Sequence, residues 1–236
     1  GDWSSDVCSS DLVADINLFK IEALADDQAD VSFINASSSF PNNLTVNSNN
    51  GILVDQDLTA TGVVRFDSDV DNNGTGDITI NDPYTVLSNN SNIFFVANDL
   101  HLLGAVNAGT ANIRIEASDE GTLAMGDDIA NFTLSGTELI KLTGNDLIVG
   151  GVDTHHVTVE NTTIANSYAN LTGSLTIYAQ SAESDITFYN QDSETRALNL
   201  YANHDVNLQR NVSTTGDVQI DADLNDDGEG DLTIDA

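Results

Sequence analysis

The sequence predicts an all-β protein, and within that class a right-handed parallel β-helix (a β-solenoid) of elongated shape. Short apolar–polar–apolar triplets recur along the chain, beginning with LTV at 44–46, VRF at 64–66 and ITI at 78–80. This alternation is typical of a half-buried strand. Asn, Asp, Gly and Ser separate the triplets and favour turns, whereas the periodicity of helix-forming residues is largely missing.

Each triplet is expected to bury its two apolar side chains and to expose the polar one between them. The later triplets are IRI (113–115), LIV (147–149), VTV (157–159), LTI (175–177), ITF (186–188), LNL (198–200), VQI (218–220) and LTI (232–234). Near-equivalent strands often start about 20 residues apart, as at Ile186 and Val206, which predicts stacked coils of that length. We therefore expect an interior that includes Val64, Phe66, Ile78, Ile80, Val218, Ile220, Leu232 and Ile234.

A longer repeat favours a solenoid over separate domains. Residues 44–80 align without a gap with residues 198–234, an offset of 154 positions. Residues 13–236 are therefore expected to form one repeat region that holds about one and a half copies of a 154-residue unit, since duplication of this kind builds solenoids and arrays. An array of β-sandwiches is the alternative, although its units would be about 100 residues long.

The first twelve residues, GDWSSDVCSSDL, differ from the rest and contain the only Trp and the only Cys of the chain. They lack the basic start and apolar run of a signal peptide. Translated back into codons, residues 2–12 resemble a short-read sequencing adapter, so we interpret residues 1–12 as an artefactual, non-native segment. The last residues, DLTIDA, stop within a strand pattern. We therefore expect residues 13–236 to be an internal piece of a longer protein.

Charge excludes several classes of partner. The formal net charge is −32, with only six Lys and Arg residues. Nucleic acid binding needs a basic face, so we expect no nucleic-acid partner. No apolar run approaches the roughly 20 residues that a membrane-spanning helix requires, so we expect no membrane insertion by this segment.

Two stretches carry a family resemblance: LSGTELIKLTGNDLIVG at 134–150 and TTGDVQIDADLNDDGEGDLTI at 214–234. They are similar to the repeats of filamentous-haemagglutinin-like, β-strand-repeat giant surface exoproteins of bacteria. The resemblance covers residues 13–236. It implies a non-catalytic stalk segment of a large secreted or cell-surface adhesin, located outside the cell or at the Gram-negative outer membrane. Host or environmental glycans or proteins would be bound by other parts of the full-length protein.

Two alternative functions compete with the expected non-catalytic role. Polysaccharide lyases and hydrolases built on a β-helix combine carboxylates with Arg or Lys in a groove, but the basic residues here are scattered. An ice- or crystal-binding protein would carry a regular Thr row, and Thr45, Thr59, Thr61 and Thr79 do not recur at one coil spacing. Neighbouring strand residues point to opposite faces, so His155 and His156 are interpreted as surface or turn histidines rather than one site.

Two acidic loops predict weak calcium binding. Both match D-x-[DN]-x-[DN]-G, the first half of the twelve-residue calcium loop, in which alternate oxygen ligands converge and Gly permits the sharp turn. Position 12 is Ile80 or Ile234 instead of Glu, and an Asp two residues before each loop could supply the missing oxygen. The alternative is a solvated turn. The candidate ligands are Asp67, Asp69, Asp71, Asn73 and Asp77, and in the second loop Asp221, Asp223, Asn225, Asp227 and Asp231.

Overall fold

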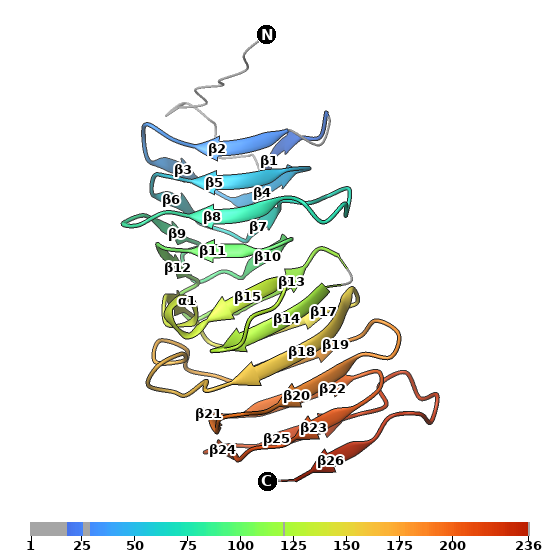
Figure 1. The fold of residues 1–236 in the computed structure, drawn as a ribbon. Helices are drawn as coiled ribbons and strands as arrows, with labels where there is room; N and C mark the ends of the chain where they lie inside the picture. The colour runs from blue at the N-terminus through green and yellow to red at the C-terminus, as the bar shows by residue number, and fades with distance from the viewer. Residues whose placement is uncertain (1–17, 26–28, 120, 236) are drawn as a thin grey trace.

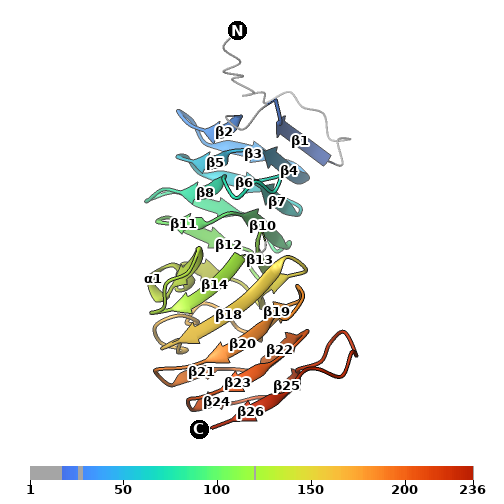
Figure 2. The same cartoon turned by 45° about the vertical axis from the view of Figure 1, so that its right-hand side comes forward.

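The computed structural model describes residues 18–25, 29–119 and 121–235, and the interpretation of residues 1–12 lies outside these ranges. The described chain is all-β, as predicted, apart from one short helix, and its strands are stacked in long parallel sheets (Figures 1 and 2). One sheet of nine strands runs from one end to the other. Its strands, in spatial order, are β1 (Leu18–Ala23), β4 (Asn43–Ser48), β7 (Val64–Asp67), β10 (Ile93–Ala97), β13 (Ile113–Ala117), β17 (Leu147–Gly151), β19 (Leu175–Ala179), β22 (Leu198–Ala202) and β25 (Val218–Asp221).

Shorter sheets complete the circuit of the chain. One of them contains β2 (Asp30–Phe33), β5 (Gly51–Val54), β8 (Asp77–Ile80) and β11 (Leu100–Leu102), and another contains β3 (Ser38–Phe40), β6 (Leu58–Ala60), β9 (Thr85–Leu87), β12 (Ala105–Asn107) and β16 (Leu142–Thr143). A third contains β15 (Phe132–Ser135), β14 (Gly121–Gly126), β18 (Thr154–Glu160), β20 (Asp185–Phe188), β23 (Val206–Leu208) and β26 (Leu232–Ile234), and β21 (Ser193–Thr195) pairs with β24 (Val212–Thr214). The helix α1 spans Gly136–Leu139.

The chain visits the sheets in rotation. Strands β4, β5 and β6 are followed by β7, β8 and β9, which pair with them in the same order and in parallel. The predicted spacing is confirmed for some coils: Leu44 stacks on Val64 and Ile186 on Val206, each 20 residues apart. Other coils are longer, because Val64 stacks on Ile93 and Ile113 on Leu147. The additional residues form loops and the α1 region, so the strand register is kept while coil length varies.

The interior is a continuous column of stacked apolar side chains. Phe33, Phe66 and Phe95 come from three different coils and lie in a row, with ring centroids 6.2 Å and 5.6 Å apart. Phe66 and Phe95 are at most 1% exposed. Aromatic contacts of this kind add to the free energy of burying the rings. The predicted interior is confirmed for Val64, Phe66, Ile78 and Ile80, which are all 0% exposed.

The same prediction is wrong at the C-terminal coil. Val218, Leu232 and Ile234 are 52%, 47% and 62% exposed, and Ile220 is only partly buried. The reason is that β25 and β26 are the last strands of their sheets in the described chain, so that their interior side chains are covered by the preceding coil alone. Burial in this fold therefore depends on both axial neighbours as well as on the strand's own alternation.

Candidate functional site

The first predicted calcium loop lies between β7 and β8, and the carboxylate of Asp69 closes it through hydrogen bonds. Asp69 is 0% exposed and accepts hydrogen bonds from the backbone N–H groups of Asn73 and Gly74 at 3.1 Å and 3.2 Å. It also accepts one at 2.6 Å from the hydroxyl of Ser118, which belongs to the next but one coil. Gly74 has φ +75°, a conformation for which glycine is favoured. The loop is thus a tight turn around a buried carboxylate.

The second loop repeats this geometry at the C-terminal coil. Asp223 accepts hydrogen bonds from the N–H groups of Asp227 and Gly228 at 3.0 Å and 3.2 Å. Asp226 and Gly228 have φ +58° and +81°, and Asn72 and Gly74 in the first loop have +51° and +75°. The sequence repeat is therefore a repeat of backbone conformation and of hydrogen bonding.

The structure gathers only some of the predicted calcium ligands. Asp71 accepts a hydrogen bond from the Asn73 amide, as Asp227 does from Asn225. The side chains of two others are engaged outside the turn: Asp67 lies 3.5 Å from Arg65, and Asp77 binds side chains of the following coil. The backbone N–H of Asp231 donates to Asp205. Asp221 accepts a hydrogen bond from the N–H of Asp223. Calcium binding by these loops remains a prediction.

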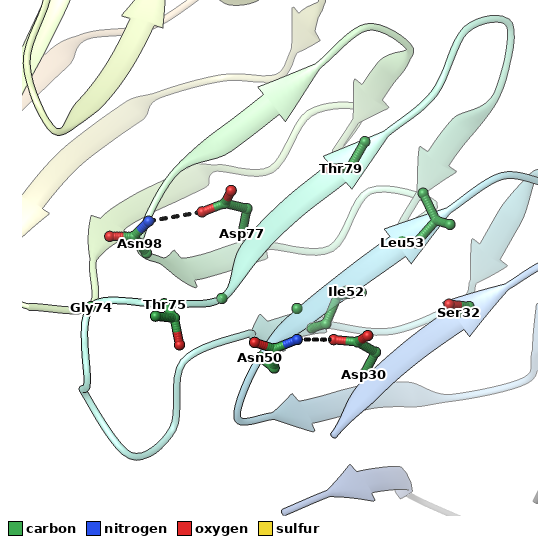
Figure 3. Close-up of a pocket in the computed structure, with 12 residues that line it drawn as sticks. Asp30, Ser32, Asn50, Ile52, Leu53, Gly74, Thr75, Asp77, Thr79 and Asn98 are labelled. Atoms are coloured by element: carbon green, nitrogen blue, oxygen red, sulfur yellow. Dashed lines mark hydrogen bonds between the residues drawn. The ribbon is translucent and has the colours of Figure 1, made fainter. Parts of the chain in front are cut away.

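A hollow of about 620 Å³ lies on the outer face of β2, β5 and β8 (Figure 3). It contains two carboxylates, each held by an asparagine amide: Asn50 donates to Asp30 at 2.8 Å, and Asn98 donates to Asp77 at 2.9 Å. In both pairs the Asp begins one strand, and the Asn lies on the next coil, one residue before the position that is level with the Asp. The carboxylates thus tie neighbouring coils together, and no Lys or Arg is among the described residues that line the hollow.

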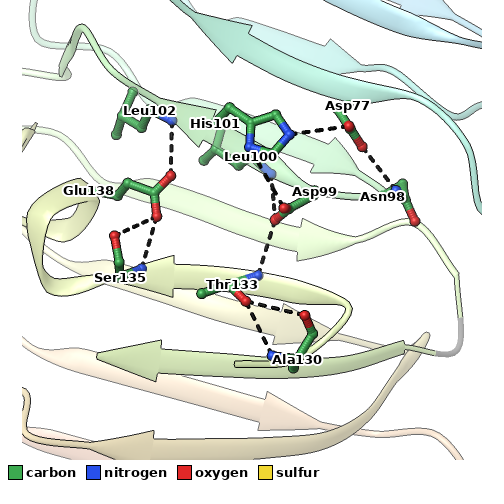
Figure 4. A network of polar contacts seen from close by, with 10 residues as sticks. All are labelled: Asp77, Asn98, Asp99, Leu100, His101, Leu102, Ala130, Thr133, Ser135 and Glu138. Carbon is green, nitrogen blue, oxygen red and sulfur yellow. Dashed lines mark hydrogen bonds and ion pairs between the residues drawn. The ribbon is translucent and has the colours of Figure 1, made fainter. Parts of the chain in front are cut away.

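A second polar network joins the edges of two sheets (Figure 4). The Asp99 oxygen Oδ1 accepts hydrogen bonds from the N–H of Leu100, on the edge strand β11, and from the N–H of Thr133, on the edge strand β15. These distances are 2.9 Å and 3.0 Å. Burial raises the pKa of Asp99, although the two N–H groups act in the opposite direction. The side chain of Asp99 thus links β11 and β15, which belong to different sheets and do not pair with each other through their backbones.

Glu138 of α1 forms a second bridge between the edge strands β11 and β15. One carboxylate oxygen accepts a hydrogen bond from the N–H of Leu102 on β11 at 3.1 Å. The other accepts from the N–H and the hydroxyl of Ser135 on β15, at 2.9 Å and 2.7 Å. Unpaired backbone N–H groups are costly when they are shielded from water. The helix therefore has a structural role, because it presents Glu138 to two strand edges.

The expectation for His155 and His156 is corrected by the structure. Their rings are stacked, with centroids 4.0 Å apart, and therefore lie on the same side of β18. The strand pairing explains this, because Gly121 pairs with Thr154 whereas Thr122 pairs with His156. This register shift is a β-bulge, and a bulge interrupts the alternation of side chains. The histidines are surface residues, as expected, but their side chains do share a face.

His156 belongs to a cluster that the sequence analysis missed. Its Nδ1 lies 3.5 Å from Oδ2 of Asp185 on the next coil. On the far side of Asp185, Nδ1 of His204 lies 3.1 Å from its Oδ1 and 3.4 Å from Oδ2 of Asp205. One donor atom each of Asp185, His204 and Asp205 lie within 4.8 Å of one another. A signal was present in the sequence, since Asp185, Asp205 and Asp231 each directly precede an apolar triplet.

The electrostatics of the two imidazoles differ. The hydrogen bond with Asp185 raises the pKa of His204, and the charges of Asp205 and Glu183 act in the same direction. Burial lowers the pKa of His156, and the neighbouring His155 adds to this effect. Asp185 is thus placed between one imidazole that readily takes up a proton and another that resists protonation.

In the described ranges, no helix has the length and apolar character needed to cross a membrane. Comparison of the chain with protein families, with curated proteins and with solved structures found no match.

Proposed function

We propose that residues 13–236 form a right-handed parallel β-helix that serves as a non-catalytic stalk segment of a large secreted or cell-surface bacterial adhesin. The observation that carries this proposal is the nine-stranded parallel sheet, which continues through the described chain while the shorter sheets take their strands in rotation. Crossover connections between parallel strands of one sheet are right-handed in about 98% of cases, which supports the proposed hand.

A stalk needs length and stiffness, and three features of the chain support this role. Hydrogen bonds between parallel strands run along the axis, so that extending the rod breaks main-chain hydrogen bonds in several sheets at once. The apolar column inside resists bending because interiors of this kind are close-packed. The high negative charge keeps such rods apart in solution. Binding of glycans or proteins is assigned to other parts of a longer protein at the cell surface.

A carbohydrate-active enzyme, the first alternative function, would use the hollow beside β2, β5 and β8 as its active-site groove. Its carboxylates are engaged by asparagine amides, and the described lining residues include no basic side chain. The ice-binding rival needs a flat row of Thr on successive coils. Thr45 stacks between Lys20 and Arg65, and Thr79 stacks between Leu53 and His101. Neither arrangement favours a rival over the stalk.

Small-angle X-ray scattering and activity assays on the whole chain test the proposal together. We expect the scattering of a rod and no lyase or hydrolase activity on a panel of bacterial, algal and plant polysaccharides. Activity that disappears in the Asp30→Asn and Asp77→Asn variants would establish the hollow as a catalytic groove and overturn the stalk. A globular scattering profile would contradict the elongated β-helix.

We also propose that the two acidic loops bind calcium weakly, with dissociation constants of roughly 10⁻⁴–10⁻³ M, the range of extracellular modules. The support is that the pattern and the turn geometry occur at both repeat positions. Asp69 and Asp223 already accept hydrogen bonds from the loop backbone, so calcium would compete with N–H donors, and this competition favours low affinity.

Calorimetric titration with calcium, with thermal unfolding as a second readout, tests the loops. The fourfold variant with Asp69, Asp71, Asp223 and Asp227 changed to Ala should lose binding. Because Asp69 is buried, a milder variant that changes only the exposed Asp71 and Asp227 separates lost binding from lost folding. We expect calcium to raise the melting temperature of the parent but not that of the milder variant. Equal stabilisation of both would show that the loops are only turns.

A further inference from the structure

One contact between coils occurs three times, and in one instance it contains a histidine. Asn50 donates to Asp30 at 2.8 Å, and Asn98 donates to Asp77 at 2.9 Å. His204 occupies the corresponding position, one residue before the residue that is level with Asp185, and its Nδ1 lies 3.1 Å from Asp185. Asparagine is therefore sufficient for the structural role of joining the coils. The imidazole at position 204 adds a chemical capacity that this role does not require.

The added capacity lies in how the imidazole faces the carboxylates. A single nitrogen, Nδ1 of His204, lies 3.1 Å from Oδ1 of Asp185 and 3.4 Å from Oδ2 of Asp205. Zinc binds such atoms at about 2.0–2.2 Å in a tetrahedron, which separates neighbouring ligand atoms by roughly 3.3–3.6 Å. The two nitrogen–oxygen separations are close to this range, and the three ligand atoms lie within 4.8 Å of one another, so that a small movement of the side chains would admit an ion.

His101 provides a contrast within the same chain. It also lies beside two aspartates, but its Nε2 faces Asp77 at 3.2 Å and its Nδ1 faces Asp99 at 3.8 Å. The two nitrogens of an imidazole direct their lone pairs away from each other. One ion therefore cannot bind both carboxylates together with His101, whereas the geometry at His204 allows it.

The surroundings of the cluster hold its carboxylates in place. Oδ1 of Asp185 accepts a hydrogen bond from the N–H of Asp205, and Oδ1 of Asp205 accepts one from the N–H of Asp231. His156 lies beside the other oxygen of Asp185. Partners of this kind orient metal ligands. The side chains of His204, Asp185 and Asp205 are 34%, 30% and 28% exposed, so an ion can reach them from solvent.

Charge also favours a divalent ion. Asp185 and Asp205 together carry two negative charges, and the ion pairs that they form within the described chain are with histidines rather than with Lys or Arg. With neutral histidines, a divalent ion would neutralise the pair. A nitrogen ligand between two carboxylates suits zinc and the neighbouring transition metals, whereas calcium and magnesium prefer oxygen ligands alone.

We propose that Asp185, His204 and Asp205 bind one divalent transition metal ion of the zinc class, with a solvent molecule as the fourth ligand. His156 is a positioning residue, because its Nδ1 accepts a hydrogen bond from the backbone N–H of Asp185 at 3.3 Å. The site bridges two coils of the sheet that contains β20 and β23 (Figure 2). It shares no ligand with the acidic loops and touches the second of them through the N–H of Asp231, which donates to Asp205. It does not depend on the stalk function.

Calorimetric titration of the whole chain with zinc chloride, in buffer that contains millimolar calcium, tests the proposal. The calcium occupies sites made of carboxylates alone. The main variant is His204→Asn, because asparagine can keep the contact with Asp185 as Asn50 keeps that with Asp30. The matched control is His101→Asn, which removes another histidine placed between two aspartates. Melting temperatures without zinc show that each variant folds.

We expect one zinc ion per chain, an increase in melting temperature with zinc, and unchanged binding in the His101→Asn variant. His204→Asn should weaken zinc binding by about 100-fold or more, and His156→Asn by roughly 10-fold, in keeping with the effects of removing ligands and their partners. Equal zinc affinity in the parent and in His204→Asn would overturn the proposal, as would the absence of zinc binding by the parent in the presence of calcium.

Discussion

The bridge made by Glu138 gives the sharpest test of how the two halves of the fold are joined. In the Glu138→Ala variant, the N–H groups of Leu102 and Ser135 and the hydroxyl of Ser135 lose their acceptor. Hydrogen bonds to a charged group contribute about 1.5–3 kcal/mol each when buried. Glu138 is only partly buried, and water can replace part of the loss. We therefore expect the free energy of unfolding to fall by about 2–4 kcal/mol.

The assay is equilibrium unfolding in urea, followed by circular dichroism, with the midpoint and slope fitted for each variant. Glu138→Gln retains one acceptor oxygen, so its free energy of unfolding should lie between those of the parent and of Glu138→Ala. Glu194→Ala is the control: it removes the same charge, and within the described chain the hydrogen bond recorded outside the strand pairing involves the backbone N–H of Glu194 and not its carboxylate. If Glu138→Ala and Glu194→Ala unfold at the same midpoint, the carboxylate does not join the sheets and the reasoning fails.

Two further predictions concern the core and one buried carboxylate. Phe95→Ala should destabilise the fold by about 3–5 kcal/mol because it leaves a cavity beside Phe66. The neighbouring Phe94 is partly exposed, so Phe94→Ala should destabilise the fold by about 1 kcal/mol or less in the same urea assay. Similar losses at both positions would contradict the assigned strand faces. Asp99→Asn keeps the oxygen that accepts from Leu100 and Thr133. Because burial raises the folded-state pKa of Asp99, the parent loses stability as pH rises from the ordinary Asp range, near 4, through that raised value. At pH 7 the Asp99→Asn variant should therefore have a higher melting temperature than the parent, and this difference should vanish at low pH. A difference in melting temperature that does not depend on pH would refute the prediction.

Particular residues show how far the sequence predicts the fold. The triplet at 64–66 predicted that Val64 and Phe66 are buried with Arg65 between them facing outward, and all three are placed so. The same reasoning failed for Val218 and Ile234, because the alternation of a strand defines which side faces inward but not whether another coil covers it. Alternation also failed at His155 and His156, where a bulge imposed by the pairing with β14 places both rings on one side.

The candidate sites divide in the same way. The acidic loops were found from sequence because their ligand pattern is contiguous, from Asp69 to Asp77 and from Asp223 to Asp231. The cluster at Asp185, His204 and Asp205 was not found, although the predicted stacking of Ile186 on Val206 already places Asp185 level with Asp205. The position of Nδ1 of His204 beside both carboxylates depends on side-chain conformations, which the sequence pattern does not define.

By itself, the sequence determined the strands at the apolar triplets, the inward side of each triplet, the turns between them and the 154-residue repeat, because side-chain alternation and turn preference are local properties of the chain. Only the tertiary structure decided which coil lies against which. Stacked partners are 20 residues apart at Leu44 and Val64, and 34 apart at Ile113 and Leu147. Loops of different length can close the same circuit, since the entropy cost of closing a loop rises only slowly with its length. The contacts of Glu138 with β11, and of His204 with Asp185, follow from that stacking.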